Sequence, residues 1–223
     1  TPLVRLGKFM AAVDKKSPFK AKMTPTVREM FRRMTPNMNF GMKLIFANLW
    51  CFSPVLNMLC KKQGGELNAL MRTTTAFTQA KGSAASNVIP PEASFVSNMR
   101  LNPADTMDSA LEYLKKTVND DRVEITKIHG MNPSRISQTD CEAYDKVASS
   151  VVSTWKGSIA APYLMMQCSD SRHYGRISDK VYRFSAMDLT SEERATIHGN
   201  NERIRVETAL KAAEFYVRLM KQC

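Results

Sequence analysis

Two β-prone segments separated by turn signals constrain the fold of this chain most strongly. Residues 70–79 are rich in threonine, which favours strands, and a turn follows at Lys81-Gly82-Ser83. A second strand is predicted over 93–101, between the Pro90-Pro91 stop and Pro103. These signals predict two strands of a sheet.

Helical patterns flank these strands. Leu3, Leu6, Phe9, Met10 and Val13 recur at helical spacing near the start of the chain. After the second strand, Asp105 or Thr106 can cap a helix that runs to about Val118, and 123–128 reads as a further strand. A β-β-α-β series after a helix predicts a small α+β sandwich with helices on one face of a sheet.

Residues from about 15 to 62 read as an insertion of helical pieces. Its most apolar run, Met38 to Cys60, contains Lys43, Asn48, Pro54 and Asn57, so no stretch of about 18 apolar residues remains to cross a membrane. We expect no membrane span, and two short buried or interfacial helices broken at Ser53-Pro54.

A second part of the chain is predicted to begin after Asn132-Pro133-Ser134. A helix with a Thr139/Glu142 capping box, buried strands at 159–166 and 181–184, and a last helix over 202–220 follow in order. That helix is expected to turn Val206, Leu210, Ala213, Val217 and Met220 inward. The alternation of strands and helices indicates part of a larger α/β layer.

The formal net charge of +11 raises the possibility of nucleic-acid binding. Residues 1–35 carry +7 of this charge, but aromatic residues do not alternate with the basic ones as a base-stacking surface requires. A solvated basic surface is the better interpretation. Five cysteines without a CxxC pair exclude zinc-ribbon and redox motifs and leave disulfide pairing open. Because the chain opens on Thr1, we expect its beginning to be missing, and the compartment is not indicated.

Four polar segments occur in a fixed order along the chain. They are Asn87-Val88-Ile89-Pro90-Pro91-Glu92-Ala93, then 99–106 (MRLNPADT), then 169–174 (SDSRHY), and finally 197–204 (IHGNNERI). This series resembles the C-terminal half of the dinuclear zinc peptidases that include carboxypeptidase S, aminoacylase, carnosinase and glutamate carboxypeptidase. It is most similar to the carboxypeptidase S branch.

The resemblance implies an α/β protein of two parts. Residues 1–132 would form most of an α+β sandwich lid, or dimerisation, domain that lacks its N-terminal edge. Residues 133–223 would form the last part of an α/β catalytic domain. Proteins of this family dimerise through the lid, so a homodimer is expected.

The resemblance also implies the roles of five residues. His198, in a Gly/Asn turn, matches the last metal ligand of the family, although a turn histidine is alternatively solvated or helix-capping. Arg100 would hold a substrate carboxylate in a bidentate contact, and Asn87, 13 residues earlier, would reach the partner subunit's active site. Ser169 and Asp170 follow a predicted buried strand, where they would contact substrate or form a turn that bonds its own backbone.

This chain departs from the family pattern in several places. The His-x-Asp motif, the bridging Asp and the catalytic Glu-Glu pair all precede the lid in such enzymes and do not occur here. Glu192-Glu193 lies after the SDSRHY segment and is interpreted as a solvated face or helix start. Gln167-Cys168 stands where a glycine is usual, and the lid histidine would lie just before Thr1.

We therefore interpret the chain as part of a zinc-dependent hydrolase. The complete enzyme would use two zinc ions to cleave the amide bond of dipeptides or N-acyl amino acids with a free carboxylate. This chain alone would supply no catalytic residue and one metal ligand. The alternative is a non-catalytic dimerisation or binding module derived from such an enzyme.

Overall fold

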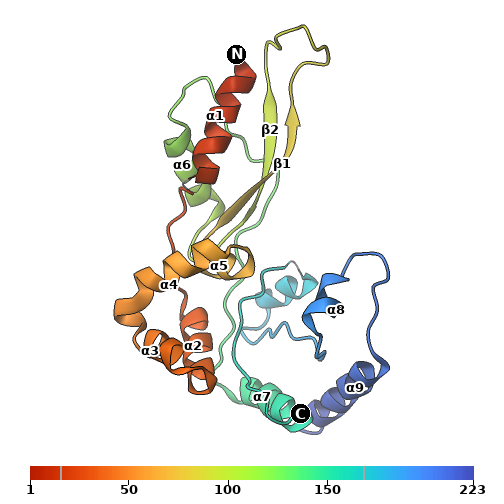
Figure 1. Cartoon of the computed structure of the whole chain (residues 1–223). Coiled ribbons are helices and arrows are strands. Elements are labelled where there is room, and N and C mark those ends of the chain that lie inside the picture. Colours follow the sequence, from red (N-terminus) through yellow and green to blue (C-terminus); the bar gives the residue numbers. More distant parts are fainter. Residues whose placement is uncertain (16, 168) are drawn as a thin grey trace.

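The protein is described by a computed structural model that covers residues 1–15, 17–167 and 169–223 (Figure 1). A long hairpin and two helices form the first group of elements, which are β1 (Thr74–Lys81), β2 (Ser94–Arg100), α1 (Pro2–Lys15) and α6 (Met107–Val118). Between α1 and β1 the chain forms a helical layer. Its elements are α2 (Pro25–Met34), the 3₁₀-helix η1 (Thr35–Asn37), α3 (Phe40–Ala47), α4 (Leu49–Gln63) and α5 (Gly65–Met71). The C-terminal group holds α7 (Glu142–Thr154), the 3₁₀-helix η2 (Asp170–Arg176), α8 (Ser191–Ala195) and α9 (Val206–Met220).

The hairpin is antiparallel, with Thr74 opposite Arg100 and Lys81 opposite Ser94. Both predicted strands are confirmed, but the first begins at Thr74 because residues 70 and 71 complete α5. The predicted strand at 123–128 is wrong. A strand requires a hydrogen-bonded neighbour, and this segment pairs with neither β1 nor β2.

An aromatic cluster joins α1 and α6 to one face of the hairpin. Phe9 of α1 stacks on Phe95 of β2 with ring centroids 5.5 Å apart, and Phe77 of β1 meets Phe95 edge-on at 5.1 Å. Ala110 and Leu114 of α6 belong to the same buried cluster. Helices thus cover one face of the small sheet, as the amphipathic patterns predicted.

A buried polar network lies where the hairpin meets the helical layer. We call Lys22, Thr73, Asn102 and Asp105 the junction network. The Thr73 hydroxyl donates to the Asp105 carboxylate at 2.6 Å and accepts from the backbone N–H of Asn102 at 2.9 Å. Lys22 pairs with Asp105, whose side chain is 1% exposed, and this hydrogen bond raises the pKa of the lysine. Asp105 is therefore committed to the network, and Thr106 caps α6.

We expect Asp105→Ala to lower the free energy of unfolding by roughly 2–4 kcal/mol, because it leaves a lysine and a buried hydroxyl without their acceptor. Denaturant unfolding measures the loss. The matched control is Asp108→Ala, which removes an exposed acid from the first turn of α6 and should cost less than about 1 kcal/mol. Equal losses in the two variants would contradict a structural role for the network.

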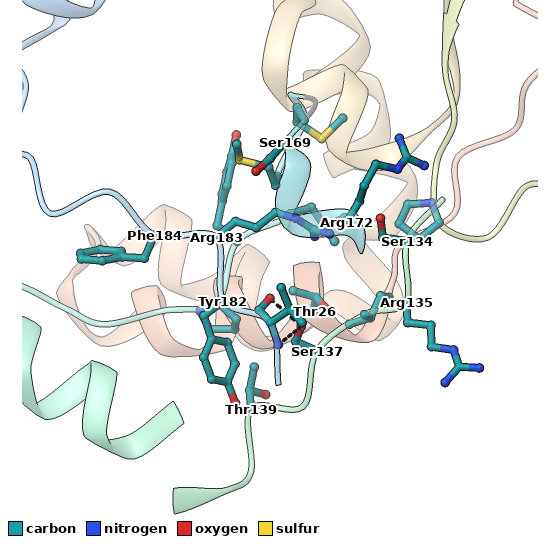
Figure 2. A pocket seen from close by; sticks show the side chains of 18 of the residues that line it. Thr26, Ser134, Arg135, Ser137, Thr139, Ser169, Arg172, Tyr182, Arg183 and Phe184 are labelled. Carbon is teal, nitrogen blue, oxygen red and sulfur yellow. Dashed lines mark hydrogen bonds between the residues drawn. The ribbon is translucent and has the colours of Figure 1, made fainter. Parts of the chain in front are cut away.

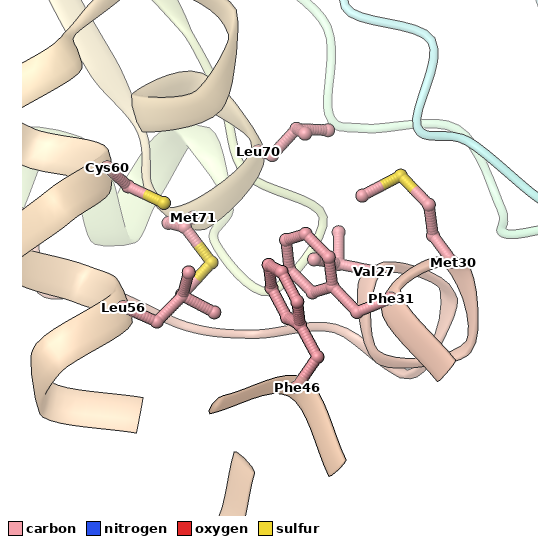
Figure 3. Close-up of a cluster of buried hydrophobic side chains, with 8 residues drawn as sticks. All are labelled: Val27, Met30, Phe31, Phe46, Leu56, Cys60, Leu70 and Met71. Atoms are coloured by element: carbon pink, nitrogen blue, oxygen red, sulfur yellow. The ribbon is translucent and has the colours of Figure 1, made fainter. Parts of the chain in front are cut away.

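The helical layer has its own core (Figure 3). Phe31 of α2 stacks on Phe46 of α3 with ring centroids 4.5 Å apart, and Leu56 and Cys60 of α4 are buried in the same cluster. Helix α2 begins firmly because the Thr24 side chain accepts a hydrogen bond from the Val27 N–H and a proline occupies its first position.

The predicted break at Ser53-Pro54 is wrong, because α3 and α4 meet at Asn48 and are bent by 116° there. Pro54 is tolerated inside α4. The only intrahelical bond it removes would have reached the carbonyl of Trp50, a residue exposed to solvent. No single helix among the described residues is long and apolar enough to cross a membrane; α3 and α4 meet that test only as a bent pair.

The C-terminal group contains less regular structure than the sequence predicted. Residues 159–166 and 181–184 are irregular rather than buried strands. An apolar run becomes a strand only beside another strand, and within the described residues none lies next to these. The predicted helix after Thr139 is confirmed as α7, but it begins at Glu142 and not directly after Thr139. Cys141 is its N-cap and makes no side-chain cap, so the Thr139/Glu142 capping box is wrong.

The last helix begins at Val206 and faces differently from the prediction. Its buried residues are Thr208 and Phe215, whereas Val206, Leu210 and Met220 are each at least 65% exposed. Phe215 determines this orientation, because its ring packs 5.0 Å from Phe184 and 5.8 Å from Trp155. Glu192-Glu193 is confirmed as a helix start, since Thr190 and Glu193 form a capping box for α8.

Candidate functional site

A cavity of about 420 Å³ lies between the end of β2, α7 and the irregular segments of the C-terminal group (Figure 2). Val147 and Val151 of α7, Leu164 and Phe184 form much of its apolar wall. Arg100 and Leu101 enter it from the end of β2. The cavity thus brings together segments from distant parts of the sequence.

The charged residues of the cavity wall are all basic. Arg100, Arg135, Arg172 and Arg183 line it, and no Asp or Glu does so among the described residues. The Arg183 Nε donates to the Ser171 hydroxyl at 2.8 Å, and the Arg172 guanidinium donates to the Asn132 carbonyl at 3.3 Å. In Figure 2, Arg172 and Arg183 lie near Ser169, whereas Arg135 is directed away from them. Such a wall favours an anionic ligand with an apolar part.

Two of the five predicted site residues line this cavity. Arg100 ends β2, is exposed, and donates one guanidinium hydrogen bond to the Met166 carbonyl. Ser169 is the N-cap of η2, where its hydroxyl accepts from the Ser171 N–H at 3.3 Å. Asp170 begins η2 but does not line the cavity. Of the pair Gln167-Cys168, which stands where the family usually has a glycine, Gln167 lines the cavity and Cys168 lies outside the described residues.

The other two predicted residues lie apart from the cavity. Asn87 is exposed in the connection between β1 and β2, which Figure 1 shows at the end of the hairpin farthest from α7 and α8. His198 is exposed in the turn after α8 with a left-handed φ of 63°, and its backbone N–H donates to the Glu202 carboxylate at 3.1 Å.

A zinc ion does not fit the donors that the described residues provide. No group of three or more His, Cys, Asp or Glu side chains comes close enough there to hold a metal ion. His198 could supply one imidazole ligand, whereas a catalytic zinc requires about three protein ligands. The described residues therefore do not supply a complete zinc site.

Sequence reasoning missed Arg172 and Arg183 as members of the cavity wall. Arg172 lies inside the polar segment 169–174, but Arg183 is 11 positions further along the chain, and only the folding of 169–184 brings them to one cavity. Tyr182 was missed too. Burial, followed by its contact with Cys141, raises the pKa of its phenol, and its hydroxyl donates to the Gln138 carbonyl at 2.7 Å.

The described cysteines (Cys51, Cys60, Cys141 and Cys223) form no disulfides with one another. The Cys141 thiol instead lies 3.1 Å from the Tyr182 hydroxyl. Together with the ring of Tyr144, which meets Tyr182 at 5.7 Å, this contact fixes one side of the cavity.

We expect Tyr182→Phe to lower the free energy of unfolding by about 1 kcal/mol, because the Gln138 carbonyl loses its donor. Thermal or denaturant unfolding measures this. Tyr174→Phe is the control, since Tyr174 is 61% exposed and the change should cost less than about 0.5 kcal/mol. An unchanged stability of Tyr182→Phe would show that the hydroxyl does not hold the cavity wall.

Comparison with known proteins identifies the class of this chain. Residues 36–126, which run from η1 through the hairpin and α6, match the family model for a peptidase dimerisation domain. The N-fatty-acyl-amino acid synthase/hydrolase PM20D1 of Xenopus tropicalis is 35% identical over 195 residues, which are 87% of this chain and 38% of that protein. The probable carboxypeptidase S-like 2 of Dictyostelium discoideum is 30% identical over 219 residues, or 97% of this chain and 42% of that protein.

Carboxypeptidase S of Saccharomyces cerevisiae is 23% identical over 180 residues. The chain spans about two fifths of the length of the first two relatives, and no solved structure matches it. These matches define a peptidase-type protein with a dimerisation domain. The chain belongs to the M20 peptidase family, and carboxypeptidase S-like proteins are among its relatives.

Proposed function

We propose that the complete protein hydrolyses the amide bond of N-acyl amino acids or small peptides that carry a free carboxylate. The observation that supports this most directly is the cavity wall, where Arg100 lies with Arg172 and Arg183 and no acid opposes them among the described residues. The names of the relatives point to the same chemistry, since they include an N-fatty-acyl-amino acid synthase/hydrolase and carboxypeptidase S.

Arg100 is the proposed carboxylate ligand. One of its guanidinium nitrogens bonds the Met166 carbonyl, which holds the side chain toward the cavity and leaves further N–H groups for a substrate oxygen pair. Ser169, at the start of η2, would orient the same end of the substrate, with Asp170 beside it. The apolar wall formed by Val147, Val151 and Leu164 suits an acyl chain or an apolar side chain.

The proposed arrangement has a lid or dimerisation domain over 1–132, with its helical insertion at about 15–62, and a catalytic segment over 133–223. Two zinc ions, when bound to the complete protein, would activate a water molecule, and His198 would be one ligand. The remaining ligands and the general base would come from residues outside this chain.

Asn87 is proposed to act in the partner subunit of a homodimer. The connection that carries it lies at the far end of the hairpin from the cavity of its own chain, so it cannot contact a ligand bound there. A second copy would bring it to a cavity, and the match to a dimerisation domain supports that assembly.

A non-catalytic dimerisation or binding module remains the second proposal, because the described residues contain no metal-binding group of three. Metal analysis of the complete protein separates the two. We expect about two zinc ions per subunit in the wild type and loss of one metal position, with most of the activity, in His198→Ala. The dimer should persist. Full metal content with retained activity would remove His198 from the ligand set.

Arg100→Lys is the sharpest test of the carboxylate site. Lysine keeps the charge but loses the bidentate fork, so we expect kcat/KM in the complete protein to fall by roughly 30- to 150-fold, about 2–3 kcal/mol. Arg135→Lys is the matched control, since its side chain is directed away from the other arginines of the cavity, and it should change kcat/KM less than about threefold.

The loss in Arg100→Lys should largely vanish on a substrate whose carboxylate is replaced by a neutral amide, because the wild type then lacks the contact. Equal losses on both substrates would mean that Arg100 supports the fold. An unchanged kcat/KM in Arg100→Lys would mean that Arg100 is a solvated residue at the end of β2 with no role in substrate binding.

A further inference from the structure

The surface of α3 and α4 that is turned away from the protein core is apolar and exposed. Its members, which we call the outer face, are Phe40, Leu44, Trp50, Val55, Met58 and Leu59. Trp50 is 84% exposed and Phe40 is 81% exposed, whereas large aromatic side chains normally bury most of their surface. Figure 1 shows α3 and α4 at the edge of the molecule, away from α8 and α9.

Helix α4 is apolar on two opposite sides. Leu56 and Cys60 are buried in the core of the helical layer, while Trp50, Val55 and Met58 of the same helix are exposed. A helix that is apolar all round requires an apolar environment on both sides. Among the described residues the core supplies one side only, and the outer face is left exposed to solvent.

The charge around the outer face has a single sign. Residues 30–65 contain no Asp or Glu. Lys43, Lys61 and Lys62 are exposed and form no ion pair within the part of the chain that the structure describes. Arg32 and Arg33, by contrast, are both held by Glu29. The partner of the outer face is therefore expected to be apolar with a negative rim.

We propose that the outer face docks the protein on an anionic phospholipid bilayer, with α3 and α4 lying in the interface between head groups and acyl chains. Exposed tryptophan and phenylalanine side chains insert readily at that depth, and lysines at the helix ends reach anionic head groups. The 116° bend between α3 and α4 favours this placement over a crossing of the membrane.

A second copy of the chain suits the outer face less well. In a symmetric dimer each partner presents the same patch, so Lys43, Lys61 and Lys62 would meet lysines of the other copy, with no acid on the patch to neutralise them. A bilayer containing anionic lipid neutralises them instead.

Docking would place the membrane close to the cavity. Ala161, Leu164 and Met166 line the cavity and also pack against the core that lies beneath α3 and α4. The core beneath the outer face therefore also contacts this part of the cavity wall.

Sedimentation of the complete protein with vesicles tests the proposal. Vesicles of phosphatidylcholine with about a third phosphatidylserine should bind it, and pure phosphatidylcholine should bind it much more weakly. Trp50→Ser and Phe40→Ser should each weaken binding about tenfold. Lys61→Gln with Lys62→Gln should weaken it roughly 25-fold at low salt.

Matched controls lie elsewhere on the surface. Ile177 is 82% exposed, so Ile177→Ser removes an equally exposed apolar side chain outside α3 and α4. Lys115 and Lys116 form an exposed pair in the last turn of α6, as Lys61 and Lys62 do in α4. Ile177→Ser and the double change of Lys115 and Lys116 to Gln should alter binding less than about twofold.

Fluorescence gives a readout that does not depend on a damaging variant. The part of the tryptophan signal that Trp50→Phe removes should be quenched by lipids brominated on their acyl chains, since Trp50 would lie among those chains. Binding that survives Trp50→Ser and Phe40→Ser, or a Trp50 signal that brominated lipid leaves unquenched, would overturn the proposal. If the complete protein does not bind the anionic vesicles, the proposal is also overturned. If, in addition, Trp50→Ser or Phe40→Ser dissociates a dimer, the outer face is a contact between two copies of the chain.

Discussion

The junction network is the interaction on which the rest of the structure depends. Asp105, with a side chain 1% exposed, receives hydrogen bonds from Lys22 and Thr73, and the buried Asn102 side chain reaches the carbonyls of Lys22 and Leu70. These contacts join the segment before α2, the end of α5 and the end of β2. Because polar groups in a low-dielectric interior are costly when unpaired, this geometry tolerates little displacement.

The network also determines where the cavity lies. Arg100 is two residues before Asn102, so the fixed position of Asn102 directs the end of β2 toward the segment 159–167. That segment is irregular and is held partly by apolar contacts with the helical layer, through Ala161, Leu164 and Met166. The basic cavity wall is thus built on an irregular segment that the helical layer and the hairpin support from behind.

The core of the helical layer supports two surfaces of the protein. One side of it carries the cavity wall, and the other carries the apolar outer face of α3 and α4. The same core therefore contacts both the wall of the proposed substrate site and the helices of the proposed membrane surface. The C-terminal group is less self-sufficient, since α9 leaves Val206, Leu210 and Met220 exposed and the apolar run 159–166 forms no strand.

The sequence by itself determined the parts whose signals are local. The threonine-rich run, the strand before Pro103 and the helix capped by Thr106 form as predicted, because strand propensity, proline and side-chain capping act within a few residues. The order of four polar segments was sufficient to indicate the family. Glu192-Glu193 was also correctly read as a helix start, since a capping box is a pattern of four residues.

Only the tertiary structure decided the features that depend on distant partners. Residues 123–128, 159–166 and 181–184 have apolar patterns suited to strands, yet a strand needs a neighbour that no local pattern supplies. The orientation of α9 depends on where Phe215 finds Trp155 and Phe184. Arg172 and Arg183 join Arg100 around one cavity through chain folding alone, and the exposure of Trp50 follows from which side of α4 the core occupies.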